Sequence, residues 1–269
     1  YILYIRNMLH FITGRHEDTL FIDHHSKISE LLISRGDEYE KVMRMMHKIY
    51  DKAMDIFLIS IHALDQIYVD SRKRKLKRIN DQYSLLDNEL FINDNAEISV
   101  EAALDTIQFC TSKNYLYSYT LIQYLKKCAR LITPEIRKNK DIFHKFIDIL
   151  SMPNSYNALN LMKLSDFLYK YIKLFEKIRH FIIYNPFHKF TVDEHSLEGI
   201  WALERLLSHD FNNFEKGKVK DLVDLAEKHK DALWLVKIAL LFHDIGKAFS
   251  GDHSRSGVEI ADLIFEELP

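Results

Sequence analysis

Turn-forming residues and cysteines are scarce in this sequence of 269 residues, which holds seven glycines, four prolines and two cysteines. So few glycines and prolines argue against an all-β fold with many tight turns and favour long helices. The two cysteines, Cys110 and Cys128, give neither a disulfide framework nor the ligand spacing of a zinc site, which suits a reducing compartment. We therefore expect an all-α protein of the cytoplasm.

The sequence also lacks a strong charge bias and any long apolar run. Lys plus Arg number 37 and Asp plus Glu 39, so the net charge of −2 predicts no general attraction to nucleic acid or to anionic lipid. A membrane span needs about twenty consecutive apolar residues, and no such run or signal peptide is present. We expect neither a nucleic acid nor a membrane as partner.

A dense basic stretch at 72–78 is the local exception to this charge balance. No aromatic residues are interleaved with its cations, so we interpret it as a solvated linker or helix face. The alternative is a patch for nucleic acid or an acidic partner. There is no Gly-rich phosphate loop, internal repeat or low-complexity segment elsewhere in the chain.

Helical periodicity covers most of the chain up to about residue 180. A polar connection is expected over 79–95, where Asn and Asp interrupt the apolar pattern, and Gly14 is expected to end the first helix. We predict a bundle-like helical region from helices at 37–68, at 98–110, from Pro134 with Thr133 as N-cap, and at 157–173.

A strongly apolar run at 233–242, interrupted only by Lys237, ends abruptly in His243 and Asp244. Such a run predicts a buried helix, and Gly246 would supply its stop. Burying an imidazole and a carboxylate is costly unless they are paired or bind a metal. The alternative to a metal site is a hydrogen-bonded His-Asp pair in the core.

Two further polar segments flank helical patterns on either side of this run. Upstream, Thr191 and Glu194 have the spacing of a capping box, and His195 follows in the first turn of that helix. Downstream, the Ser-Gly-Asp sequence at 250–252 predicts a turn that holds Asp252 and His253 and opens another helix. Three helices that meet at these polar ends would form a metal site.

His195 followed by the His243-Asp244 pair resembles the opening of the HD phosphohydrolase superfamily. Longer strings resemble the uridylyl-removing domain of the bifunctional P-II uridylyltransferases. The strings that carry this resemblance lie at 187–195, 241–247 and 251–254, and the segment 9–24 resembles the end of the nucleotidyltransferase region of the same enzymes. The resemblance implies a helical region at 1–180, after a nucleotidyltransferase domain that is absent here, and the opening helices of an HD domain at 181–269.

Mixed imidazole and carboxylate ligands suit a divalent metal, with Mg²⁺ or Mn²⁺ as the first expectation and Fe or Zn as alternatives. We expect His195, His243 and Asp244 to be metal ligands. His253 is a further candidate, either for a second ion or as a substrate contact, with a helix-cap or surface histidine as the alternative. Lys247 would meet a phosphate as a point charge, and Asp252 would orient water.

The resemblance implies hydrolysis of the uridylyl-tyrosine phosphodiester on the P-II signal protein, which releases UMP in nitrogen signalling, with glutamine as effector. The nucleotidyltransferase motifs are absent, so we expect no UMP transfer. The chain begins at Tyr1 rather than Met and ends at Pro269 within a helical pattern. We therefore expect a piece of a longer protein whose HD site lacks a closing Asp. Two alternatives stay open: an HD phosphohydrolase that acts on a free nucleotide, and a non-catalytic helical regulatory or interaction fragment.

Overall fold

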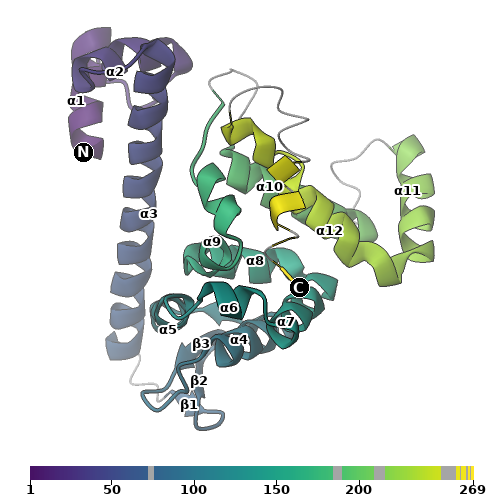
Figure 1. The fold of residues 1–269 in the computed structure, drawn as a ribbon. Coiled ribbons are helices and arrows are strands. Elements are labelled where there is room, and N and C mark those ends of the chain that lie inside the picture. Colours follow the sequence, from purple (N-terminus) through teal and green to yellow (C-terminus); the bar gives the residue numbers. More distant parts are fainter. Residues whose placement is uncertain are drawn as a thin grey trace.

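The computed structural model describes residues 1–71, 76–183, 190–208, 216–249, 259–260, 262–264, 266 and 268–269. Helices dominate these residues, so the expected all-α class is confirmed, although one small sheet interrupts it (Figure 1). Within the described part, no helix is both long and apolar enough to cross a membrane.

The long helix α3 runs along one side of the molecule, with α1 and α2 at one end of it (Figure 1). A small separate core holds these three helices together and contains Ile5, Leu9, Ile28 and Met45. Gly14 ends α1 as predicted, with a left-handed φ of 68°. The bounds are α1 Ile2–Thr13, the 3₁₀ turn η1 Ile22–His24, α2 His25–Leu32 and α3 Glu38–Ser71.

A four-stranded sheet follows α3, and the expected polar connection at 79–95 is wrong. Strands β2 and β3 form an antiparallel hairpin in which Tyr83 pairs with Ile92, and Asp87 takes a left-handed φ of 53° in its turn. The local Asn and Asp residues serve the turns, while side chains such as Leu86 and Leu90 are buried. The strands, in spatial order, are β1 Lys77–Arg78, β2 Tyr83–Leu86, β3 Glu89–Ile92 and β4 Leu116–Tyr117, the last parallel to β3.

Helices α4 to α9 form the body of the molecule around the main hydrophobic core. Thr133 is the N-cap that the sequence predicts, since its hydroxyl accepts a hydrogen bond from the Ile136 amide. The single helix expected at 157–173 is broken, because Asp166 adopts a left-handed φ of 61° between two helices. The bounds are α4 Val100–Ser112, α5 Tyr119–Ala129, α6 Pro134–Arg137, α7 Lys140–Ser151, α8 Ser155–Leu164, α9 Phe167–Tyr171 and η2 Lys173–Ile178.

The C-terminal part packs against this body through α10 and α12 (Figure 1). Buried side chains on both sides of residue 180, such as Leu159 and Leu241, belong to one continuous core. The division into two parts at this point stays a prediction. The bounds are α10 Val192–Leu207, α11 Lys216–Lys228, η3 Lys230–Ala232, α12 Leu233–Phe242 and η4 Ile245–Ala248.

Candidate metal centre

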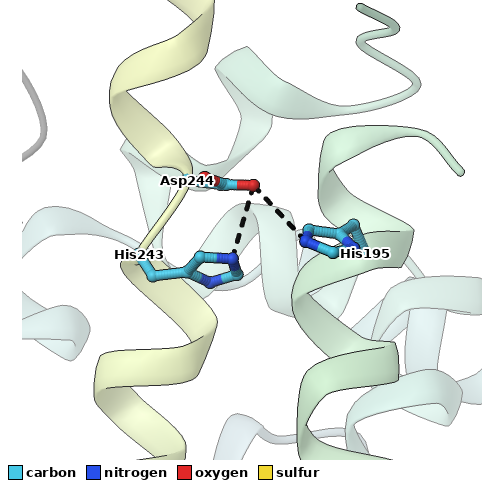
Figure 2. A group of neighbouring side chains, drawn as sticks. All are labelled: His195, His243 and Asp244. Carbon is cyan, nitrogen blue, oxygen red and sulfur yellow. Dashed lines mark ion pairs between the residues drawn. The ribbon is translucent and has the colours of Figure 1, made fainter. Parts of the chain in front are cut away.

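Two packed helices carry the candidate site, and each presents its polar residues at one end (Figure 2). His195 lies in the first turn of α10, and His243 and Asp244 follow directly after α12. The predicted helix over the apolar run is confirmed, although Leu235 and Val236 on it are about half exposed. Gly246 is not its stop, because α12 ends at Phe242 and Gly246 lies in the 3₁₀ turn η4.

The side chains of His195, His243 and Asp244 converge on one point. Asp244 Oδ2 lies 3.3 Å from His243 Nε2 and 3.6 Å from His195 Nε2. One ligand atom from each residue lies within 4.8 Å of the other two. Among the described residues, no other group of three or more His, Cys, Asp or Glu side chains has ligand atoms this close together.

A backbone contact fixes the tautomer of His243. Its Nδ1 lies 2.7 Å from the carbonyl oxygen of Leu240. A carbonyl only accepts hydrogen bonds, so Nδ1 carries the proton and donates it. In the neutral imidazole Nε2 then keeps its lone pair, and this is the nitrogen that faces Asp244. Orientation of a metal-binding histidine by a backbone carbonyl is a common feature of metal sites.

Solvent reaches the histidines more easily than the carboxylate. The side chains of His195 and His243 are 49% and 36% exposed, whereas that of Asp244 is 12% exposed. Lys247, one turn further along the chain, places Nζ 2.6 Å from Asp244 Oδ2. The predicted phosphate contact therefore lies beside the candidate ligands and is ion-paired with one of them.

The other two candidates from the sequence, Asp252 and His253, lie outside the described residues. The expected capping box at the start of α10 is absent: Thr191 occupies the N-cap position, but its side chain makes no capping bond. Glu194 instead forms an ion pair with Lys163 of α8. The first turn of α10 is thus held by side chains outside the helix.

A buried ion pair anchors α12 to α10. Lys237, the one charge within the apolar run, is 2% exposed. Its ammonium donates to Glu204 Oε1 at 2.9 Å and to the carbonyl oxygen of Met152 at 2.7 Å. The same glutamate oxygen accepts a hydrogen bond from the hydroxyl of Ser155. This network fixes α10, which carries His195, relative to α12, which His243 directly follows.

A buried carboxylate, Asp193, is a residue that sequence reasoning missed. It is 1% exposed and lies two positions before His195. The hydroxyl of Tyr169 donates to its Oδ2 at 2.6 Å. The pKa of Tyr169 is raised well above its usual value, first by burial and then by the charge of Asp193, so the tyrosine stays a donor. Its position in the first turn of a helix was the sequence feature that could have pointed to Asp193. Acidic residues at this position are usually interpreted only as favourable contacts with the helix dipole.

The donor set fits a divalent metal ion. Two imidazole nitrogens and one carboxylate oxygen suit Mn, Fe, Zn or Mg, and three protein ligands leave positions for substrate and water. Nothing in this geometry selects among these metals.

Comparison with known proteins found similarity to one family model and to curated proteins. Residues 217–269 match the family model "HD domain", a segment that contains His243 and Asp244 but begins after His195. No solved structure matches the chain significantly.

Similarity to curated proteins extends over almost the whole chain. Three relatives share the name bifunctional uridylyltransferase/uridylyl-removing enzyme. That of Haemophilus influenzae (strain PittEE) is 26% identical over 264 residues, 95% of this chain and 30% of its own length. The relative from Nitrosospira multiformis is 27% identical over 94% of the chain, and that from Hydrogenovibrio crunogenus 29% over 96%. The chain spans about 30% of the length of these relatives.

Proposed function

Because this chain carries an HD domain, and is homologous over about 95% of its length to bifunctional uridylyltransferase/uridylyl-removing enzymes, we propose that it is a metal-dependent phosphodiesterase of the uridylyl-removing type. The match to the HD-domain model over residues 217–269 supports a place among the metal-dependent phosphohydrolases. The observation that carries the metal-dependent part of this proposal is the convergence of His195, His243 and Asp244 from two helix ends. The uridylyl-removing part rests on the similarity to the relatives.

In this proposal the three side chains hold one divalent ion. A bound ion supplies Lewis-acid polarisation of a phosphoryl oxygen and a more acidic water. His243 is prepared for ligation because its Nδ1–H is directed to the Leu240 carbonyl, which leaves Nε2 available. Asp244 contributes the carboxylate oxygen towards which both histidines point (Figure 2).

The substrate is proposed to be a uridylyl-tyrosine phosphodiester. Water attacks phosphorus, the bond between phosphorus and the tyrosine oxygen breaks, and a proton passes to that oxygen, so that UMP and an unmodified tyrosine result. Lys247 would leave its pairing with Asp244 and neutralise a phosphate oxygen when substrate is present. Asp252 and His253 keep their predicted roles near this reaction, as water-orienting group and further ligand or substrate contact.

The wider setting belongs to the same proposal. The partner would be uridylylated P-II in nitrogen signalling, with glutamine as an effector of the longer relatives. A helical region at 1–180 would precede an HD part at 181–269. A reducing cytoplasm agrees with the two buried cysteine thiols, Cys110 and Cys128.

The test measures metal binding and hydrolysis on the same samples. We expect the protein, extended until it includes the closing Asp that the resemblance implies, to bind Mn²⁺ and to release UMP from uridylylated P-II. His243→Ala and Asp244→Ala in this extended protein should abolish both. His229→Ala, which alters an exposed histidine remote from the three ligands in sequence, is the control and should change neither. Unchanged Mn²⁺ stoichiometry in both site variants would overturn the assignment of the ligands. Hydrolysis of free nucleotides without hydrolysis of uridylylated P-II would instead favour the free-nucleotide alternative.

A further inference from the structure

The first turn of α10 presents His195 but lacks the usual side-chain cap. The first four amides of a helix have no partner within it, and an N-cap side chain normally satisfies one of them. Thr191 makes no such bond here. Asp193 Oδ1 instead accepts a hydrogen bond from the amide of Glu194 at 3.0 Å, while the amide of His195 donates to the carbonyl oxygen of Thr191. The turn therefore depends on the carboxylate of Asp193.

The carboxylate of Asp193 is itself held from outside the helix. Its Oδ2 accepts a hydrogen bond from the Tyr169 hydroxyl at 2.6 Å and one from the backbone amide of His180 at 3.2 Å. A bond of 2.6 Å from a hydroxyl to a carboxylate lies in the range of strong, charge-assisted hydrogen bonds. Because Asp193 is 1% exposed, its charge depends on these donors rather than on water.

Both donors are themselves fixed. The guanidinium of Arg179 stacks over the ring of Tyr169 at 3.8 Å, and Tyr169 is 2% exposed. His180 has a φ of 51°, a region that residues other than glycine rarely adopt. Its ring Nδ1 lies 2.7 Å from Asp51 Oδ1 on α3, so the ring and the backbone of His180 contact different helices. Backbone strain of this kind persists where the surrounding contacts determine the conformation.

We propose that Asp193, held by Tyr169 and His180, is a positioning residue that fixes the first turn of α10 and thereby the approach of His195 to the metal. This inference rests on the proposed function, because it requires His195 to be a ligand. Asp193 touches neither metal nor substrate in this scheme. It acts on the backbone from which the histidine projects, as an outer-shell group of the metal site.

The chain offers a matched pair of variants to test this proposal. Tyr169 and Tyr171 are both buried and both lie on α9. The hydroxyl of Tyr169 bonds to Asp193, whereas that of Tyr171 has no hydrogen-bond partner among the described residues. Tyr169→Phe and Tyr171→Phe therefore remove the same atom, with and without a link to α10.

The experiment titrates the extended protein, which includes the closing Asp, with Mn²⁺ at a temperature where every variant is folded. Binding is followed by the electron paramagnetic resonance of Mn²⁺. We expect the dissociation constant to rise roughly tenfold in Tyr169→Phe, the usual size of an outer-shell effect. It should stay within about twofold in Tyr171→Phe, where no such contact is lost. Asp193→Asn, which keeps an accepting oxygen, should weaken binding less than Asp193→Ala.

Amide hydrogen exchange in metal-free protein supplies a second readout. Compared with wild type, the amides of Glu194 and His195 should exchange faster in Tyr169→Phe and at the same rate in Tyr171→Phe. This readout does not require the Asp193→Ala variant to fold. Equal Mn²⁺ affinity and equal amide exchange in the two tyrosine variants would overturn the positioning role of Asp193 but not the proposed function. A wild type that binds no Mn²⁺ would overturn the proposed function and this inference with it.

Discussion

The ammonium of Lys247 lies 2.6 Å from Asp244 Oδ2, the oxygen that also faces both histidines of the site. Two cations, this ammonium and a metal ion, would therefore compete for one carboxylate oxygen. We expect Lys247→Met to bind Mn²⁺ several-fold more tightly, because a like charge beside the ion is removed. The same variant should hydrolyse a phosphodiester more slowly, because a phosphate contact is lost.

Isothermal titration with Mn²⁺ and a single-turnover assay would measure the two effects separately. Lys230→Met removes an exposed lysine on η3 and serves as the control. Weaker Mn²⁺ binding in Lys247→Met than in this control would contradict the competition.

The buried pair of Lys237 and Glu204 predicts a large effect on stability. Lys237→Met would leave the carboxylate of Glu204, which is 10% exposed, without its cation. Breaking such a pair from one side typically costs about 3–5 kcal/mol of unfolding free energy. Urea denaturation should report a loss of this order, whereas Lys230→Met should stay within about 0.5 kcal/mol.

A double-mutant cycle provides the check on this interpretation. Replacement of both partners, as Lys237→Met with Glu204→Gln, should cost less than the sum of the two single changes, because no buried charge is left alone. Additive costs would mean that the pairing itself contributes little.

Two carboxyl groups at the junction of α3 and the sheet predict a pH dependence of stability. Burial, and then the charge of Asp65, raises the pKa of Glu89 to about 7, and the two side chains share a hydrogen bond. Asp65 Oδ2 also accepts a hydrogen bond from the Tyr119 amide at 2.6 Å. The folded protein thus keeps a proton on Glu89 that the unfolded chain, with an ordinary pKa near 4.5, would release.

The folded state binds the proton of Glu89 more tightly than the unfolded state, so raising the pH lowers the stability. This contribution to stability is fully present below about pH 4.5 and is lost as the pH rises through about 7. For a partly exposed carboxyl screened by solvent we expect about 1–2 kcal/mol over that window. Urea denaturation at several pH values should show this slope in wild type and in Glu30→Gln, an exposed control. An unchanged slope in Glu89→Gln would exclude Glu89 as its source.

Tyr171 predicts a substitution that does not destabilise the protein. Its side chain is fully buried, and its hydroxyl lacks a hydrogen-bond partner among the described residues. Removing a buried polar atom without a partner ends its desolvation penalty, so Tyr171→Phe should be neutral or stabilising by up to about 1 kcal/mol. A loss of more than about 1 kcal/mol in urea denaturation would point to an undetected bond.

The sequence predicted those helices and helix ends that are determined by residues close together in the chain. Apolar periodicity predicted α3, and the unbroken apolar run predicted α12. Turn and capping residues predicted the end of α1 at Gly14 and the start of α6 after Thr133. The β2–β3 hairpin was missed because its strands are only four residues long and lie among Asn and Asp residues. The break between α8 and α9 rests on one left-handed residue, Asp166, whose carboxylate pairs with Arg179.

At this site, the candidate ligands could be predicted from the sequence but the residues that support them could not. Sequence reasoning could select His195, His243 and Asp244, and the structure brings these three together, while their binding of metal stays a prediction. The partners that hold them could not be predicted, because Glu204 meets Lys237 and Asp193 meets Tyr169 only once distant helices pack. Contacts between residues so far apart in the chain produce no recognisable pattern in the sequence.

The continuous core across residue 180 has a thermodynamic consequence. Leu159 of α8, Ile200 of α10 and Leu241 of α12 belong to one cluster, whereas Ile5, Leu9, Ile28 and Met45 form another. The body and the part after residue 180 should therefore unfold as one cooperative unit, and the end of α3 with α1 and α2 as a smaller one. An ion held at the ends of α10 and α12 would then delay the melting of helices as remote as α4, but not that of α1.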